Sequence, residues 1–465
     1  MSLWSLKDVA VAVGAKAPTA DGDVSGVSID TRTLQTGDLF VALKDVRDGH
    51  EFVADAVARG AAAALVSRAV PGVSAEKLIK VESTQAALEA LGRARRAAVS
   101  ARVAAVTGSV GKTSTKEALR HLLGFQGRTH ASAASYNNLW GVPLSLARMP
   151  RDTQFGVFEI GMNHAGEITP LTAQVRPHVA IVTMVAAVHL ENFASVGEIA
   201  DAKGEIFSGL EQGGVAVINA DLEWTGRLKA HASEARPSRI VTYGRAAGSD
   251  IRLMSLDLSE QSSNAYIELF GKPLRYRIGA PGEHWAINSL GVLAVISALG
   301  ADAERAAGDM ASLSALAGRG ARETIEGSKG AFELIDESYN ANPLSMGAAI
   351  ATLGRAQPAL GGRRIAVLGD MLELGPTAGE LHAGLAKPLA DERIDVVFAS
   401  GPLMHHLWDA IAEGQRGGYA ATSAEIAESV AQTVKAGDIV MIKGSYGSKM
   451  RVVVEALRKL GRAEN

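Results

Sequence analysis

The residues with the clearest chemical pattern form a short glycine-bearing segment that ends in lysine and threonine. The segment reads Thr107, Gly108, Ser109, Val110, Gly111, Lys112, Thr113, and Ser114 then opens a stretch with leucines at helical spacing. An apolar run at 103–106 precedes it and predicts a buried strand. In such a strand–loop–helix unit, backbone N–H groups and the helix N-terminus face an anion, the lysine reaches the outer phosphates, and the threonine hydroxyl holds Mg2+. The pattern therefore predicts a nucleoside triphosphate site, in a shortened form that has Val106 where the longer motif has glycine.

Two further residues stand where predicted strands end. Glu159 lies near the end of the apolar stretch 155–160, where a carboxylate is costly unless it is paired or binds a metal ion. With a nucleotide loop nearby we interpret Glu159 as a ligand of Mg2+, and a solvated glutamate is the alternative. The glycine that follows shortly after it lets another group come close. His189 follows the apolar run 179–188, and a lone histidine is more often structural than a ligand.

Three other polar features allow two interpretations each. Lys203 lies in a predicted helix, 196–210, where spacing alone indicates a solvated lysine. The adjacent amides of Asn137 and Asn138 suit either phosphate or sugar binding or a turn. The segment 336–343 holds more hydrogen-bonding groups than a connector requires, although turns after strands are often only connectors.

The composition limits the class of protein. The chain has 465 residues, enough for about three domains, and its formal net charge of -3 without a long basic run argues against a nucleic-acid partner. The absence of cysteine excludes disulfides and thiolate metal sites and is typical of a reducing compartment. Residues 1–16 lack the pattern of a signal peptide, and the run 179–188 is too short to span a bilayer. We therefore predict a soluble cytoplasmic protein.

The pattern of elements divides the chain into three α/β blocks. Residues 1–100 hold short strand-like runs and a helix at 84–99. Residues 101–316 alternate strands and helices, as in a parallel sheet covered on both faces, and then change to antiparallel strands within 251–278. Residues 317–465 alternate again, after a glycine-bearing hinge at 318–320. The strands of this third block are predicted at 332–335, 365–368, 396–399 and 439–442.

Each strand of the third block ends in a polar or glycine-bearing turn. Ligands of open parallel sheets bind at the carboxyl ends of the strands. Four such turns in one block favour a binding face over a set of simple connectors.

Taken together, these motifs resemble the Mur ligase family, the ATP-dependent amide-bond ligases of peptidoglycan precursor synthesis. The shortened loop at 107–113 is that family's form. Within the family, the strings at 340–343 and 369–375 are typical of the member that joins D-alanyl-D-alanine to a UDP-muramoyl-tripeptide. The other matching strings are 28–32, 37–43, 48–50, 137–138, 141–143, 202–206, 336–343, 368–375 and 443–445.

The resemblance implies a small UDP-binding domain at 1–100, a central P-loop ATPase domain at 101–316 and a C-terminal Rossmann-like ligase domain at 317–465. It implies ligation of D-alanyl-D-alanine to UDP-muramoyl-tripeptide through an acyl phosphate, driven by ATP with two Mg2+ ions. It also implies a monomer without nucleic-acid or membrane partners. The alternatives are another Mur or folylpolyglutamate-type ligase and, in a different class, a P-loop switch or motor.

The resemblance also implies a role for each matching position. Lys112 would neutralise the β- and γ-phosphates, Thr113 and Glu159 would hold one Mg2+, and His189 would help to hold a second. Lys203 would be carbamylated, so that it binds metal as a carboxylate does. The remaining assignments are ATP contacts at Asn288, Arg319, Asp336 and Tyr339 besides 107–114, UDP-substrate contacts at Ser28, Thr31, Arg32, Asn137 and Asn138, and the D-alanyl-D-alanine region at Asn340 and Asn342.

Three positions depart from the family pattern. Trp285 stands where asparagine is expected, which predicts that stacking helps to hold the adenine. Glu337 stands where a second aspartate is common, and Lys44 where glycine is common. None of these positions lies in the phosphate loop.

Overall fold

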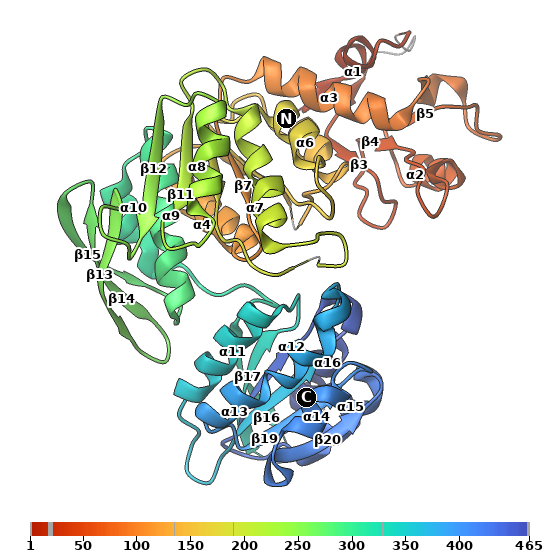
Figure 1. Ribbon diagram of the computed structural model, residues 1–465. Coiled ribbons are helices and arrows are strands. Elements are labelled where there is room, and N and C mark those ends of the chain that lie inside the picture. The colour runs from red at the N-terminus through yellow and green to blue at the C-terminus, as the bar shows by residue number, and fades with distance from the viewer. Residues whose placement is uncertain (1, 17–21, 134, 189, 328–329, 463–465) are drawn as a thin grey trace.

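The computed structural model describes residues 2–16, 22–133, 135–188, 190–327 and 330–462 (Figure 1). In this part of the chain the strands form a two-stranded ribbon and sheets of four, nine and six strands, with helices packed on the larger sheets. The predicted α/β class is confirmed. None of the helices in these ranges is long and apolar enough to cross a membrane.

The N-terminal domain is built on a small parallel sheet. Its elements are β1 (Trp4–Ser5), α1 (Leu6–Val13), β2 (Asp23–Val24), β3 (Gly26–Ser28), β4 (Asp38–Val41), η1 (Gly49–Phe52), α2 (Val53–Ala58), β5 (Ala63–Val66), η2 (Ala75–Lys77), β6 (Leu78–Lys80) and α3 (Thr84–Ala98). The sheet order is β3-β4-β5-β6. Arg96 on α3 donates from Nε to the Val175 carbonyl and from a terminal nitrogen to the Arg176 carbonyl, both at 2.7 Å. These bonds fasten the N-terminal domain to the central one.

The central domain carries the predicted phosphate loop. Its elements are β7 (Arg102–Thr107), α4 (Lys112–Gly124), β8 (Thr129–Ala131), α5 (Gly141–Ala147), β9 (Phe155–Glu159), α6 (Ile168–Val175), β10 (Val179–Val182), α7 (Val196–Gly204), η3 (Glu205–Gly209), β11 (Val215–Asn219), α8 (Thr225–Glu234), β12 (Arg239–Gly244), β13 (Ile251–Leu258), β14 (Ser263–Leu269), β15 (Lys272–Ile278), α9 (Glu283–Ala298), α10 (Ala303–Asp309) and η4 (Met310–Ser312). The strands form one sheet in the order β15-β14-β13-β12-β11-β10-β7-β9-β8.

The strands around the loop are buried on both faces of the central sheet. Helices α4, α9 and α10 pack on one face, where Leu119 and Leu290 are fully buried, and α6, α7 and α8 pack on the other, where Ile199 is fully buried. This explains the nearly continuous apolar runs of β7 and β10, because a strand covered on both sides has no solvent face. Strands β10, β7 and β9 are parallel neighbours, so their carboxyl ends meet at one edge.

The C-terminal domain is a second α/β unit, at the bottom of Figure 1. Its elements are β16 (Ala321–Gly327), β17 (Gly330–Glu337), α11 (Pro343–Arg355), β18 (Arg364–Gly369), η5 (Gly375–Thr377), α12 (Ala378–Ala383), α13 (Ala386–Asp391), β19 (Val396–Ser400), α14 (His405–Ala410), η6 (Glu413–Gln415), β20 (Arg416–Ala420), α15 (Ser423–Thr433), β21 (Ile439–Lys443), η7 (Tyr446–Ser448) and α16 (Arg451–Arg462). The sheet order is β16-β17-β21-β18-β19-β20, parallel except for β16.

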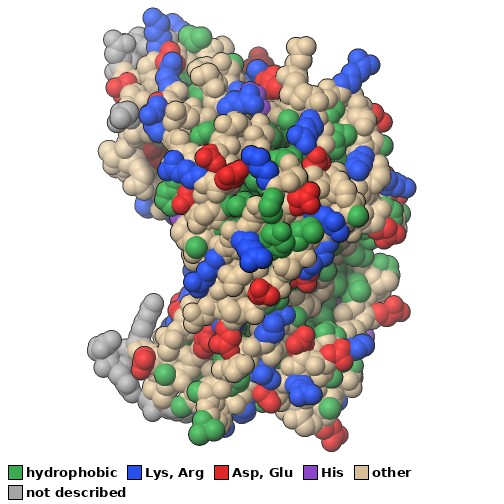
Figure 2. Space-filling view, turned by 90° about the vertical axis from the view of Figure 1, so that its left-hand side faces the viewer, with side chains coloured by type: hydrophobic (Ala, Val, Ile, Leu, Met, Phe, Trp, Pro, Cys, Tyr) green, Lys and Arg blue, Asp and Glu red, His purple; other side chains and the backbone are tan. Residues whose placement is uncertain are grey.

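Contacts also join the C-terminal and central domains. The hydroxyl of Tyr339 donates to Ser135 Oγ at 2.5 Å, and the backbone N–H of Gln357 donates to a Glu260 carboxylate oxygen at 2.8 Å. Figure 2 shows the surface indented between the C-terminal domain, in its lower part, and the rest of the molecule. On this face the basic and acidic side chains are interspersed.

Two sequence expectations are refined by the fold. The predicted antiparallel set is β13–β15, and it continues the central sheet because β13 pairs in parallel with β12 at Tyr243 and Gly244. The predicted helix 196–210 is α-helical only to Gly204 and continues as the 3-10 helix η3.

Candidate active site

The phosphate loop joins β7 to α4 as the sequence predicts. Gly108 adopts a φ of +151°, and a Cβ at this position would overlap the hydroxyl of Thr183 at the end of β10. That hydroxyl lies under the loop and hydrogen-bonds the Val110 carbonyl at 2.6 Å. Ser109 is held on the same side, because its N–H donates to the Met184 carbonyl at 2.7 Å. The loop is therefore shaped by its neighbouring strand as well as by its own glycines.

We predict that Gly108→Ala destabilises the protein and abolishes nucleotide binding. The strained backbone alone should lower the free energy of unfolding by about 1–3 kcal/mol, and the clash with Thr183 adds to this. Denaturant unfolding and titration with an ATP analogue measure the two effects. The matched control is Gly124→Ala, at the end of α4, where an added Cβ meets nothing within 4 Å. It should change the free energy of unfolding and the affinity for the ATP analogue only slightly. Normal nucleotide affinity in Gly108→Ala would contradict the loop assignment.

Lys112, the first residue of α4, points back over the loop. Its Nζ donates to the Gly108 carbonyl at 2.6 Å. Desolvation by the surrounding protein lowers the pKa of Lys112, nearby Glu159 acts to raise it, and the charge of Arg319 lowers it further. A cation held in this position faces the space above the loop, where phosphate is expected.

Glu159 receives one hydrogen bond on each carboxylate oxygen. Thr113 donates its hydroxyl to Oε2 at 2.9 Å, and Asn137 donates its amide to Oε1 at 2.8 Å. The side chain is almost fully buried, with 1% exposed. The group that comes close across the glycine, as the sequence predicts, is Asn137, because a Cβ on Gly161 would lie 2.9 Å from its side-chain carbon.

The chemistry of these groups suits Mg2+. Each Glu159 oxygen keeps lone pairs beyond the one that accepts, and the Thr113 oxygen keeps its own. Mg2+ takes oxygen ligands and is usually bound by one or two protein groups plus phosphates and water. Among the described residues no group of three or more histidine, cysteine, aspartate or glutamate side chains could hold a metal ion.

Lys203 lies on α7 and is buried, with 2% of its surface exposed. The prediction from spacing alone, a solvated helix lysine, is therefore wrong, because this face of α7 packs into the domain. Burial lowers the pKa of Lys203 well below its ordinary value, and repulsion from Lys112 lowers it further. His189, predicted to act beside it, lies outside the described residues.

The predicted contacts with the nucleoside lie around the loop and the hinge. Asn288 on α9 lies against Gly111, where an added Cβ would be 3.0 Å from its amide nitrogen. The Arg319 guanidinium lies 4.1 Å from the ring centroid of Tyr339. Asp336 is buried at the end of β17 and accepts from the Ser338 hydroxyl at 2.6 Å. Trp285 has only 7% of its surface exposed and packs in the core, which leaves little of its ring for stacking on adenine.

At the predicted D-alanyl-D-alanine region, loops from neighbouring strands meet. The Lys443 ammonium donates to Glu337 at 3.1 Å and to the Asn340 carbonyl at 3.0 Å. Ser445 accepts from the Leu372 N–H at 2.9 Å. Asn342 begins α11 in a capping box with Ser345, which gives its side chain a structural role.

The predicted UDP-substrate residues are dispersed. The Ser28 hydroxyl is buried and donates to the Asp30 carbonyl, while Arg32 is exposed and forms an ion pair with Asp30 at 2.6 Å. Thr31 is partly exposed between them. Asn138 accepts from the N–H groups of 140 and 141 at the start of α5.

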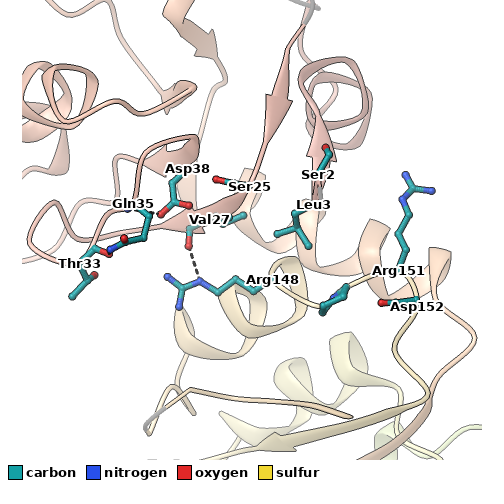
Figure 3. A pocket seen from close by; sticks show the side chains of 12 residues that line it. Ser2, Leu3, Ser25, Val27, Thr33, Gln35, Asp38, Arg148, Arg151 and Asp152 are labelled. Atoms are coloured by element: carbon teal, nitrogen blue, oxygen red, sulfur yellow. Dashed lines mark hydrogen bonds between the residues drawn. The ribbon is translucent and has the colours of Figure 1, made fainter. Parts of the chain in front are cut away.

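A hollow of ≈ 700 Å³ lies between the N-terminal and central domains (Figure 3). Its lining comes from the amino ends of β3 and β4, including Asp38, and from the segment after α5. Arg148 crosses it and donates to the Val27 carbonyl at 2.6 Å. The predicted uridine residues 28, 31 and 32 lie instead at the carboxyl end of β3 and do not line this hollow.

Sequence reasoning missed some residues that shape the site. In the sequence Thr183 is marked only as a polar residue that interrupts the apolar run 179–188, and Ser135 gave no signal. Asn137 was predicted to contact the UDP-substrate, whereas in the structure its amide donates a hydrogen bond to Glu159.

Comparisons with known proteins agree with this arrangement. Family models match in three segments: the Mur ligase family catalytic domain at 23–97, the Mur ligase middle domain at 106–296 and the Mur ligase glutamate ligase domain at 321–446. The chain is 31% identical to the UDP-N-acetylmuramoyl-tripeptide–D-alanyl-D-alanine ligase of Rickettsia prowazekii, with 97% of this chain and 99% of that protein covered. It is 34% identical to the enzyme of the same name from Escherichia coli, with 95% of each covered.

Solved structures give the same result. The crystal structure of MurF from Acinetobacter baumannii matches with a TM-score of 0.84 and 29% identity, over 98% of this chain and 99% of that one. MurF ligase from Thermotoga maritima in complex with ADP matches with a TM-score of 0.78 and 28% identity, over 95% and 98%. The fold and site define a three-domain protein with a P-loop for nucleoside phosphate. The chain belongs to the Mur ligase family.

Proposed function

We propose that this protein joins D-alanyl-D-alanine to UDP-N-acetylmuramoyl-tripeptide with ATP, which gives the UDP-muramoyl-pentapeptide precursor of peptidoglycan, ADP and phosphate. The observation that carries the proposal is a phosphate loop whose Thr113 meets the buried carboxylate of Glu159, in a chain whose full-length relatives bear the name of this activity. The predicted boundaries near 100 and 316 and a cytoplasmic location remain part of this proposal.

The reaction requires activation of a carboxylate, which is a poor acyl donor because its leaving group would be oxide. A carboxylate oxygen of the tripeptide attacks the γ-phosphorus of ATP, the bond to the β,γ-bridging oxygen breaks, and ADP leaves. The amine of the dipeptide then attacks the acyl carbon, the nitrogen loses a proton, and phosphate departs with the electrons of the C–O bond. Lys112 offsets negative charge on the transferring phosphoryl group. Thr113 and Glu159 would hold Mg2+, which supplies further charge neutralisation.

Lys203 is proposed to act as a carbamate. Beside Lys112 and a metal ion, a bare ammonium would be repelled. The lowered pKa of Lys203 favours its neutral amine, and this is the form whose nitrogen adds to the carbon of CO2 and releases a proton. The product carries a negative charge and two oxygens, as a carboxylate does, and together with His189 it would hold a second Mg2+.

The other proposed roles rest on position. The proposed contacts with the nucleoside are Asn288, Arg319, Asp336 and Tyr339. The proposed contacts with the uridine nucleotide are Ser28, Thr31, Arg32 and Asn138. The proposed contacts with the dipeptide are Asn340 and Asn342. The contacts of Asn288 with the loop and of Arg319 with Tyr339 support the first group.

A single assay tests the proposed function. Purified protein should release phosphate from ATP only when both UDP-N-acetylmuramoyl-tripeptide and D-alanyl-D-alanine are present, and the pentapeptide product should be detected by mass spectrometry. A P-loop switch would hydrolyse ATP without either substrate. Product formation with a single amino acid, but none with D-alanyl-D-alanine, would favour another Mur or folylpolyglutamate-type ligase.

We also predict that substrates close the C-terminal domain onto the central one. Gly318 and Gly320 have φ values of +74° and +96°, which suits a hinge in the segment between the two domains. Closure would exclude water from the acyl phosphate. Small-angle scattering should give a smaller radius of gyration with an ATP analogue and UDP-substrate than without them. An unchanged radius, with full activity in protein cross-linked in the open form, would refute closure.

A further inference from the structure

A short loop of the central domain contacts both the C-terminal domain and the carboxylate of Glu159. It follows β8 and precedes α5. Ser135 in this loop accepts a 2.5 Å hydrogen bond from the Tyr339 hydroxyl of the C-terminal domain. Two residues further on, Asn137 donates a 2.8 Å hydrogen bond to Glu159 Oε1. The two contacts are thus separated by one residue of the same backbone.

The loop is fixed at its Asn137 end by the strand that carries Glu159. The Gly161 N–H donates to the Asn137 carbonyl at 2.8 Å, and the absence of a side chain at 161 lets the amide pack against the backbone there. Asn138, the next residue, accepts from the N–H of Gly141 at 2.9 Å and so anchors the loop to α5. These contacts hold the Asn137 amide beside Glu159, and the C-terminal domain holds the same backbone two residues earlier, at Ser135.

Glu159 depends on this amide for its orientation. Thr113 holds Oε2, and one hydrogen bond alone would leave the carboxylate free to rotate about its terminal bond. With the Asn137 amide on Oε1, both oxygens are fixed, and their remaining lone pairs keep one direction. Groups that orient a metal ligand in this way tune metal affinity.

We propose that Asn137 is a positioning residue for the metal-binding carboxylate of Glu159, and that the Ser135–Tyr339 hydrogen bond couples this positioning to docking of the C-terminal domain. The inference rests on the proposed metal site of Thr113 and Glu159. It means that the site reaches its full metal affinity only when the C-terminal domain is in place.

Binding of Mn2+ to the full chain with a non-hydrolysable ATP analogue, followed by electron paramagnetic resonance, tests the first part. Asn137→Ala should weaken Mn2+ binding by about 10-fold or more. Affinity for the analogue without metal should stay unchanged, and so should the melting temperature within a few degrees. The matched control is Asn264→Ala, an exposed asparagine on β14, which should leave Mn2+ binding unchanged. Wild-type Mn2+ affinity in a folded Asn137→Ala protein would overturn the proposal.

The coupling is tested by removing each partner of the interdomain bond. Tyr339→Phe and Ser135→Ala should each weaken Mn2+ binding by about fivefold, and the double variant should be no weaker than either one. Neither Tyr339→Phe nor Ser135→Ala should weaken Mn2+ binding further when Asn137 is already replaced by alanine. Tyr446→Phe is the control. It removes the same hydroxyl group from an exposed ring whose centroid lies 6.0 Å from that of Tyr339, and it should leave Mn2+ binding unchanged. Additive effects, or unchanged Mn2+ affinity in both single variants, would overturn the coupling.

Glu159→Ala separates failure of this inference from failure of the proposed metal site. If Glu159→Ala binds Mn2+ as wild type does, the metal site itself is wrong. If Glu159→Ala loses Mn2+ and Asn137→Ala does not, only the positioning role is wrong.

Discussion

Replacing Lys112 by alanine is expected to lower the rate of ligation by at least about 10²-fold without unfolding the protein. The ammonium lies over the loop, and loss of one preorganised group that stabilises transition-state charge costs a factor of this size. The fold should persist because Thr183 and the backbone of 184 hold the loop, whereas the Lys112 side chain bonds only to the loop's own Gly108 carbonyl among the hydrogen bonds described. Initial rates of phosphate release with both substrates, together with a melting curve, give the two measurements.

Lys229→Ala is the matched control for this variant. Lys229 is exposed on α8, so its replacement removes the same charge from a helix away from the loop. Its rate should be within about twofold of wild type, since surface substitutions of this kind have small effects. Near-normal turnover in a folded Lys112→Ala protein would show that the loop does not bind the transferring phosphates.

The phosphate loop could be predicted from sequence because its parts are contiguous. Strand β7, the glycines and the first turn of α4 occupy consecutive positions, and local pattern is enough to recognise them. The carboxyl ends of β9 and β10 were also predictable, because buried strands give continuous apolar runs. Glu159 was therefore placed correctly at a strand end beside the loop.

Three of the edge strands were not predicted. Strand β8 lies at one edge of the central sheet, and β16 and β20 lie at the two edges of the C-terminal sheet. β20 contains two consecutive glycines, and β16 carries charged residues at 322, 323 and 326. A strand with a neighbour on only one side needs a weaker apolar pattern, so its sequence resembles that of a loop.

Contacts between distant segments could not be predicted from one sequence. Asn137 and Glu159 are 22 positions apart, and Ser135 and Tyr339 are 204 apart. The amide of Asn137 fits a turn, a sugar or a carboxylate equally well, and only the packing of its loop against Gly161 selects the last. Burial of Lys203 was hidden for the same reason, because its helix carries no pattern that separates a buried lysine from a solvated one.

Lys203→Ala is expected to be nearly inactive, with a loss comparable to that of Lys112→Ala, and to be partly restored by acetate. The reason is chemical: alanine leaves a space at a buried position, and a short carboxylic acid can supply there the charge and oxygens that the carbamate would have provided. Activity should rise with acetate concentration and saturate as a binding site fills. Rates over a series of formate, acetate and propionate, in the presence of both substrates, measure the rescue.

Two controls test whether the rescue depends on the negative charge of acetate and on the space left at position 203. Acetate should not restore Lys112→Ala, because a carboxylate cannot replace a cation beside phosphate. Lys203→Arg should stay inactive with or without acetate, since its guanidinium fills the space and keeps a positive charge beside Lys112. Carbamylation can also be read without activity, because ¹³CO2 should give the wild-type protein a carbamate carbon resonance that Lys203→Ala lacks. A fully active Lys203→Ala protein, or a resonance that survives in it, would mean that the buried lysine serves packing alone.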